Sequence, residues 1–388
     1  MTNLKFNEAK SNVLWTYLNF EDALCEVKYT SKVQRKNFKD FGTYPIISQE
    51  SEFINGYWDL ECDLFRIENP LVIFGDHTKV IKYVDFNFVL GADGVKILNP
   101  ISKINAKFLA YFLMSCQIPD LGYARHYRLL KEISVPAPPL IEQMRIVAIL
   151  DQVFADIEQA RANTEQNLKN ARELFESYLQ QVFSHQSKIF GDVWLSHITE
   201  SISDGDHSAP PKSEIGVPFI TISNINKSSN EVDFSNTFMV PVEYYKSLKA
   251  QRRPQLNDIL YTVTGSYGIP VLVNEAKEFC FQRHIGLIRP KDNINSSWLY
   301  YSLMSPQVFS QADLGATGTA QKTVSLKTLR GISVPNAPLD AQMKALADIN
   351  LIYRKSKILE GVYISKLTSL EELKKAIIQK AFSGELTK

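Results

Sequence analysis

Several features that define other protein classes are missing from this chain. No apolar run approaches the roughly 18 residues that a membrane-spanning helix needs, and the N-terminus lacks the apolar stretch of a secretion signal. The cysteines stand far apart without a Cys-x-x-Cys pair, which argues against a disulfide framework and a zinc ribbon; they are Cys25, Cys62, Cys116 and Cys280. We therefore expect a cytoplasmic protein with reduced thiols and no membrane partner.

Catalytic motifs are missing as well. There is no Gly-x-x-x-x-Gly-Lys-Ser/Thr phosphate loop, so ATP hydrolysis on this chain is not expected. Its Pro-Pro pairs precede Leu140 and Lys212, whereas amino-methyltransferases place an aromatic residue there to hold a flipped base. None of the six histidines forms a His-x-x-x-His pair. These absences predict a non-catalytic chain with no cofactor or metal of its own.

Two Gly-Asp-His tripeptides, at residues 75–77 and 205–207, could be read as paired metal ligands. They stand at non-equivalent places in the two halves of the chain, and Gly-Asp is typical of turns. We favour turns over a metal site.

The net charge of +1 excludes a polycation that would hold nucleic acid by overall charge, so any such binding must use local patches. The 388 residues, 45% of them apolar, are enough for two or three domains with cores of their own.

One segment occurs twice. Residues 133–145 read ISVPAPPLIEQMR, and residues 332–344 read ISVPNAPLDAQMK, with an offset of 199 and eight of thirteen positions identical. The prolines favour an extended backbone, because a residue that precedes proline avoids the α region. After each copy, an apolar repeat without proline indicates a helix of about fifty residues, with steps of three and four typical of a coiled coil.

The two predicted helices carry opposite charge, since residues 137–186 have an excess of Asp and Glu and residues 336–388 an excess of Lys and Arg. Such complementarity favours pairing, and an intervening domain that turns the chain around would make the pair antiparallel. About 45 residues at 1.5 Å per residue would form a spacer of roughly 65–70 Å. The predicted seam and docking positions are Leu140, Met144, Val147, Leu150, Phe154, Leu168, Phe175, Tyr178, Met343, Leu346, Tyr353, Leu367, Leu370 and Ile377, with Ser356 and Lys374 as interruptions.

The remaining segments predict two α+β domains. Short β-rich runs at residues 44–48, 71–74 and 79–84 precede a predicted helix at 105–115, and residues 217–222, 258–268 and 295–305 repeat this plan. We divide the chain into a first domain (1–136), a first long helix (137–186), a second domain (187–335) and a second long helix (336–388). The whole is a pseudo-twofold internal repeat.

Each domain ends in a polar segment rich in hydrogen-bond donors, directly before its long helix. Arg and Gln side chains read purines, whereas Thr, Lys and backbone groups contact phosphate. Basic clusters elsewhere in each domain suit backbone contacts, although a solvated loop remains the alternative for any single residue. The candidate DNA contacts are Arg125, His126, Tyr127, Arg128, Thr317, Thr319, Gln321, Lys322, Thr323, Lys32, Arg35, Lys36, Arg252 and Arg253.

The repeated segment, the alternation of domains and helices, and the C-terminal Ala381-Phe-Ser-Gly-Glu-Leu together resemble the specificity subunit of Type I restriction-modification enzymes. The resemblance covers essentially the whole chain. It implies two target-recognition domains that each read half of a bipartite double-stranded DNA target. The second copy carries Ala337 and Ala341 where the first has Pro138 and Glu142, so partner docking there can differ.

The resemblance also implies partners. Two methyltransferase subunits would dock on the helical regions and methylate adenine N6 with S-adenosylmethionine, and two motor-nuclease subunits would cleave unmodified DNA with ATP and Mg. Two alternatives stay open: a recognition subunit for a fused methyltransferase-nuclease, and a scaffold that binds other proteins.

Overall fold

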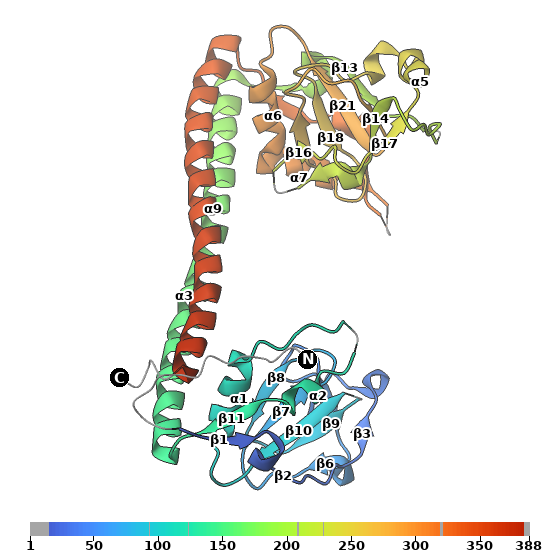
Figure 1. Ribbon diagram of the computed structural model, residues 1–388. Helices are drawn as coiled ribbons and strands as arrows, with labels where there is room; N and C mark the ends of the chain where they lie inside the picture. Colours follow the sequence, from blue (N-terminus) through green and yellow to red (C-terminus); the bar gives the residue numbers. More distant parts are fainter. Residues whose placement is uncertain are drawn as a thin grey trace. The chain divides into compact units, whose positions relative to one another are not determined.

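A computed structural model describes residues 15–92, 94–122, 124–207, 209–227, 229–318 and 321–383. The contacts between residues divide the chain into two compact units: unit 1 is Met1–Glu165 with Ser365–Lys388, and unit 2 is Gln166–Ile364. Each unit combines one α+β domain with a stretch of each of two long helices (Figure 1). The domain boundaries drawn from the sequence remain a prediction.

Unit 1 contains two main sheets. Its four-stranded antiparallel sheet has the order β2-β10-β7-β8, and β1 pairs with β11 beside it. A second sheet has the order β3-β9-β4-β5, with β6 also on β9. The elements are β1 (Thr16–Asn19), β2 (Leu24–Cys25), β3 (Lys32–Val33), β4 (Tyr44–Ile47), β5 (Gly56–Trp58), β6 (Leu64–Phe65), β7 (Leu71–Gly75), β8 (Ile81–Val84), β9 (Phe88–Gly91), β10 (Val95–Pro100), α1 (Ala106–Ser115), α2 (Tyr127–Leu130) and β11 (Ser134–Ala137).

Unit 2 repeats the first sheet. Its four-stranded antiparallel sheet has the order β13-β21-β18-β19, β12 pairs with β24, and a further sheet has the order β17-β14-β20. The elements are β12 (Asp192–Trp194), α4 (Leu195–Ile198), β13 (Thr199–Asp204), β14 (Val217–Ile220), β15 (Ile225–Asn226), β16 (Glu231–Val232), β17 (Phe238–Val240), α5 (Val242–Ser247), β18 (Ile259–Thr262), β19 (Pro270–Leu272), β20 (Cys280–Phe281), β21 (Ile285–Pro290), α6 (Ser296–Met304), α7 (Pro306–Leu314), β22 (Ala316–Thr317), β23 (Thr323–Val324), α8 (Leu326–Arg330) and β24 (Ser333–Pro335).

The predicted internal repeat is confirmed by this topology. In both units the last strand of the four-stranded sheet leads into a helix, α1 or α6, whose N-terminus is capped by an asparagine side chain. Asn105 accepts hydrogen bonds from the amides of Lys107 and Phe108, and Asn295 accepts one from the amide of Trp298. Equivalent residues therefore start equivalent helices.

The repeated segment joins each domain to its long helix through a buried glutamine. Gln143 Oε1 accepts a hydrogen bond from the amide of Asn105 (2.8 Å), and its Nε2 donates to the carbonyls of Lys103 and Pro138 (2.8 Å each). In unit 2, Gln342 accepts from the amide of Asn295 (2.8 Å) and donates to the carbonyl of Ala337 (2.8 Å). Neither glutamine is exposed to solvent. We call this interaction the glutamine clasp.

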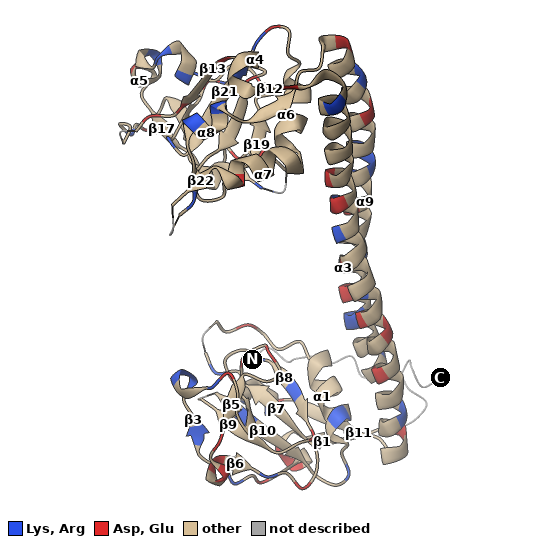
Figure 2. Cartoon of the chain, turned by 180° about the vertical axis from the view of Figure 1, so that it is seen from behind, with Lys and Arg blue, Asp and Glu red and all other residues tan. Residues whose placement is uncertain are grey.

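The predicted long helices are α3 (Leu140–Phe190) and α9 (Leu339–Phe382). In unit 1, Lys374 pairs with Glu158 (2.8 Å) and Arg161 with Glu371 (3.2 Å). Later residues of α9 thus meet earlier residues of α3, which makes the pair antiparallel. In unit 2, Arg172 pairs with Glu360 (3.3 Å). Both signs of charge run along both helices (Figure 2), as partner selection by flanking charges requires.

Most predicted seam residues lie between the helices or against the domains. Val147, Phe154 and Ile377 pack around buried Ile146, Leu150 and Ala381. In unit 2 the core includes Phe175 and Leu346, with Tyr178 and Tyr353 against it. Leu168, Leu367 and Leu370 are half-buried.

At the start of each helix, three residues of the predicted seam and docking set do not lie in the seam. These residues face solvent: Leu140 is 46% exposed, Met144 61% and Met343 51%. The reason is that each helix begins with the face that bears Gln143 or Gln342 against its domain, which leaves the opposite face in solvent. The seam begins instead at Ile146, which is fully buried.

The two predicted interruptions of the seam are accommodated by polar contacts. Ser356 is buried and donates to the carbonyl of Ala171 (3.0 Å). Lys374 pairs with Glu158 and lies over the ring of Phe154. No helix in the described part of the chain is long and apolar enough to cross a membrane.

We predict that Gln143→Leu lowers the free energy of unfolding by about 3 kcal/mol, because the amide of Asn105 and two carbonyls lose their buried partner. Gln152→Leu on the same helix is the control, since Gln152 is exposed and its side chain bonds Asp156 on the helix surface; its effect should stay within about 0.5 kcal/mol. Urea denaturation measures both. An equal effect of the two changes would contradict the clasp.

Candidate nucleic-acid interface

In unit 1 the donor-rich segment before the long helix is held against the turn that follows β7. The amide of His126 donates to the carbonyl of Asp76 (2.7 Å), and the amide of Tyr127 donates to the Asp76 carboxylate (2.8 Å). Asp120 pairs with Lys79 (3.3 Å) and accepts from the amide of Gly122. These contacts lower the pKa of Asp120, the Gly122 amide having the largest effect. The segment is therefore fixed by its backbone, whereas the side chains of Arg125 and Arg128 are exposed.

The structure gives His126 a different role from the predicted DNA contact. Its side chain has no exposed surface. Nε2 accepts a hydrogen bond from the amide of Leu121 (3.1 Å), which leaves Nδ1 to donate to the carbonyl of Asp76 (3.0 Å). Both ring nitrogens are thus used within the protein, and His126 positions the arginines on either side of it.

A short chain of contacts joins this segment to the predicted basic cluster of unit 1. The ammonium groups of Lys96 and Lys131 lie 5.1 Å and 5.8 Å from the centre of the Tyr127 ring. Burial is the main cause that raises the pKa of the Tyr127 phenol. The backbone amide of Ile97, on β10, donates a hydrogen bond to the hydroxyl oxygen of Tyr29 (2.9 Å). Lys32 lies over the Tyr29 ring (5.6 Å).

The two other predicted basic residues of that cluster, Arg35 and Lys36, differ in their contacts. Arg35 pairs with Glu50 (2.8 Å) and lies over the ring of Phe38 (5.1 Å). Lys36 is exposed. Of these two, Lys36 is the better placed for a phosphate.

In unit 2 the corresponding segment forms the hairpin β22–β23. Thr317, Gln321 and Lys322 are exposed and Thr323 is half-buried; Thr319 lies outside the described residues. Lys322 pairs with Asp313 (2.9 Å), which also accepts a short hydrogen bond from the Tyr267 hydroxyl. The Tyr267 bond, followed by that of Lys322, lowers the pKa of Asp313. These contacts tie the hairpin to α7.

Two neighbouring hollows meet at Asp204, at the end of β13. One, of about 400 Å³, is lined by the predicted Gln321 and Thr323 together with His207, Arg283 and His284. The other, of about 500 Å³, is lined by the predicted Arg252 with Lys249 and Arg330. Because Asp204 and Leu326 line both, the fold brings together predicted residues that are some seventy positions apart.

The carboxylate at this junction is neutralised. Asp204 accepts from Arg252 (3.2 Å) and contacts His207 Nε2 (2.7 Å). Arg253 lies away from it, over the ring of Tyr245 (6.0 Å). The surface around Asp204 therefore offers mainly hydrogen-bond donors, which suits phosphates and base edges.

Sequence reasoning missed Arg283 and His284, which directly precede β21. They carry no local pattern, and only the pairing of β21 with β18 brings them beside β23. Arg330 was missed for the same reason, since it donates to the carbonyl of Ile202 across the domain (2.8 Å).

The Gly-Asp-His tripeptide of unit 1 lies where β7 ends in a turn, as expected, whereas in unit 2 Asp206 forms a β-bridge with Gln282 and His207 lies in a bend. Gly205 is tightly enclosed, because a Cβ there would lie 2.0 Å from the carbonyl oxygen of Phe281. Within the described ranges, no three His, Cys, Asp or Glu residues are arranged to hold a metal ion.

The exposed apolar residues at the start of each long helix form two further surfaces. On α3 they are Leu140, Ile141 (80% exposed) and Met144, and on α9 they are Leu339 (47%) and Met343. Because the repeat presents this surface once in each unit, we call the two surfaces the paired helix starts. Exposed apolar clusters of this kind are typical of protein contacts.

These features define a duplicated protein, in which one α+β domain occurs twice and each copy presents donors beside a helix start. The Type I restriction modification DNA specificity domain matches residues 13–166 and 205–364. The match covers most of the chain, which therefore belongs to that family.

Curated relatives share low identity over long stretches. The chain is 25% identical to the EcoBI specificity subunit of Escherichia coli over 67% of its own length and 60% of that subunit. It is 24% identical to the EcoKI subunit of Escherichia coli strain K12, covering 75% of this chain and 68% of that subunit. For the EcoR124I/EcoR124II subunit of Escherichia coli, identity is 22% and coverage is 80% of each.

Solved structures agree in fold. A chain of a type I R-M system, studied for its complex assembly and conformational transition, aligns with a TM-score of 0.72 and 17% identity, covering 98% of this chain and 100% of that one. The HsdS subunit from Thermoanaerobacter tengcongensis aligns with a TM-score of 0.56 and 18% identity, covering 99% and 100%. The predicted fold of two domains with long helices is confirmed.

We predict that His126→Phe loosens the segment before α3 without touching its arginines. Loss of the two buried hydrogen bonds should cost about 1–3 kcal/mol and speed hydrogen exchange of the Leu121 amide at least roughly tenfold. Arg125→Ala is the control, because this exposed side chain should leave the exchange unchanged. Unaltered exchange in the His126 variant would remove its positioning role.

Proposed function

We propose that each α+β domain reads one half of a bipartite, asymmetric sequence of double-stranded DNA. The observation that carries this proposal is the convergence of donors at Asp204 in unit 2, where Gln321, Arg283 and Arg252 gather from three separate segments. Arginine and glutamine are the side chains that recognise guanine and adenine edges in the major groove. A net charge of only +1 fits binding by such local surfaces.

In unit 1 the corresponding role falls to Arg125 and Arg128. The backbone between them is held by Asp76 and by buried His126, whereas both arginine side chains are exposed. Lys32 and Lys36 would contact phosphate and set the orientation of the domain. Because the loops of the two domains differ while their four-stranded sheets agree, the two halves of the target would differ as well.

The long helices would set the distance between the two half-sites. α3 and α9 each contribute to both units, and antiparallel ion pairs hold them together in each. A helix of fixed length is a suitable spacer, since its rise per residue is constant.

The paired helix starts would dock two methyltransferase subunits, which would methylate adenine N6 with S-adenosylmethionine bound to themselves. Two motor-nuclease subunits, supplied with ATP and Mg, would complete a complex that cleaves unmodified DNA. This chain would supply recognition and no catalytic group. A partner in which methyltransferase and nuclease are fused would use the same surfaces.

The test uses the complex of this chain with its methyltransferase subunit and duplexes in which each half of the target is scrambled in turn. The double variant Arg125→Ala/Arg128→Ala should bind the intact target at least roughly tenfold more weakly, as expected for lost base contacts of about 1–3 kcal/mol each. Scrambling one particular half of the target should no longer lower the affinity of the variant, whereas scrambling the other half should still lower it. Fluorescence anisotropy measures both effects.

Arg66→Ala is the matched control, because this exposed arginine of unit 1 already pairs with Glu61. Equal weakening on random DNA would reassign Arg125 and Arg128 to phosphate contacts. A complex with no salt-dependent affinity for DNA at all would favour the protein-binding scaffold instead.

A further inference from the structure

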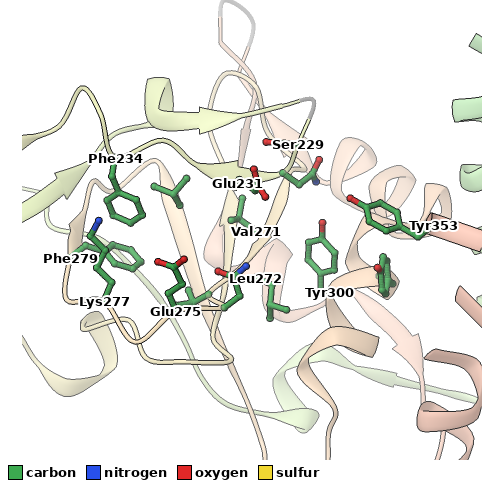
Figure 3. Close-up of a pocket in the computed structure, with 15 residues that line it drawn as sticks. Ser229, Glu231, Phe234, Val271, Leu272, Glu275, Lys277, Phe279, Tyr300 and Tyr353 are labelled. Carbon is green, nitrogen blue, oxygen red and sulfur yellow. The ribbon is translucent and has the colours of Figure 1, made fainter. Parts of the chain in front are cut away.

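Unit 2 contains a cavity of about 460 Å³ that lies apart from the donors around Asp204. It is bounded by β16, by β19 and the loop after it, by α6, and by Tyr353 of α9 (Figure 3). A cavity of this size is within the range of small-molecule sites. None of its lining residues belongs to the predicted DNA contacts, although Tyr353 is a seam residue.

Aromatic rings line both ends of the cavity. At one end Phe234 and Phe279 pack edge to face, with their ring centres 5.7 Å apart. At the other end the ring centre of Tyr301 lies 5.1 Å from that of Tyr300 and 5.9 Å from that of Tyr353. Clusters of ring faces attract cations through their quadrupoles.

The structure already contains two such cation contacts here. The Lys277 ammonium lies 3.7 Å from the centre of the Phe234 ring. The Lys357 ammonium lies 5.6 Å from the centre of the Tyr353 ring and pairs with Glu360 (3.3 Å). The rings of this region thus accept ammonium groups.

Carboxylates outnumber ammonium groups among the lining residues. Glu231 and Glu275 lie around the open space between the two aromatic ends, whereas Lys277 is drawn to the Phe234 end (Figure 3). A phosphate or a nucleotide would meet two carboxylates with one lysine to offset them, so the charge of the cavity disfavours an anion.

A buried phenol faces the same space. Tyr300 is only 9% exposed, and its hydroxyl points into the cavity (Figure 3). Within the described residues its hydroxyl makes no hydrogen bond, and it is not one of the buried unpaired atoms, which belong to Thr30, Tyr261 and Ser302, so the oxygen is open to the cavity. Burial is the first cause that raises the pKa of Tyr300, so the phenol stays neutral and can accept a hydrogen bond from an N–H group.

We propose that this cavity binds an organic cation with N–H donors, an alkylamine or a guanidinium group. The carboxylates of Glu231 and Glu275 would neutralise it, the tyrosine rings would cover its alkyl part, and the Tyr300 hydroxyl would accept one of its hydrogen bonds. Such a cation has two sources: a free polyamine, or a basic side chain of a partner protein.

The test is a pair of calorimetric titrations of the full-length chain at fixed ionic strength and without DNA. One titration uses spermidine, and the other uses Nα-acetyl-arginine methylamide. We expect one saturable site per chain for at least one of the two probes. Tighter binding of spermidine assigns the site to a free polyamine, and tighter binding of the arginine derivative assigns it to a partner's side chain. Because no DNA is present, the outcome is independent of the proposed recognition function.

The double variant Glu231→Gln/Glu275→Gln should weaken binding at least tenfold, and Tyr300→Phe should weaken it without altering the fold. The control is Glu214→Gln/Glu243→Gln, which removes the same charge from exposed residues of unit 2 outside the cavity. Absence of saturable binding for both probes overturns the proposal. So does an equal loss in the control, because that result identifies nonspecific attraction to surface carboxylates.

Discussion

The structure depends on the glutamine clasp. A buried amide side chain at the start of a long helix satisfies the backbone amide that precedes the asparagine-capped helix of its domain, as Gln143 does for Asn105 and Gln342 for Asn295. Both glutamines are fully buried, so the loss of either side chain leaves the backbone groups that it bonds without that partner. The clasp thereby attaches the start of each long helix to the segment that begins α1 or α6 of its domain.

The same constraint explains the two surfaces beside it. With Gln143 and Ile146 turned toward the domain, Leu140 and Met144 are left in solvent, and the seam between α3 and α9 starts later than the apolar repeat does. In the proposed function, DNA recognition and partner assembly therefore use different surfaces. The donors before each helix face DNA in the proposed function, and the helix starts face partner proteins.

The sequence predicted the fold well, because heptads, prolines and an internal repeat are local patterns. The sequence did not show that Leu140 is exposed and Ile146 buried, since both fit an apolar repeat. Only the contact with the domain determines which of the two is buried. The candidate site was less predictable. Arg125 and Gln321 stand in an obvious segment, but His126 in that segment is buried, and Arg283 joins Gln321 only through strand pairing. Residue type reveals chemistry, whereas exposure and neighbourhood depend on tertiary contacts.

The central claim is that two domains read two half-sites at a distance set by the paired helices. Its most direct test is methylome sequencing of a host that carries the methyltransferase with either the full chain or a variant lacking residues 158–164 and 368–374, which face each other through Glu158, Arg161, Glu371 and Lys374. The account predicts one bipartite motif for the full chain, and for the variant the same two halves with a shorter spacer. An unchanged spacer, or altered half-sites, would contradict it.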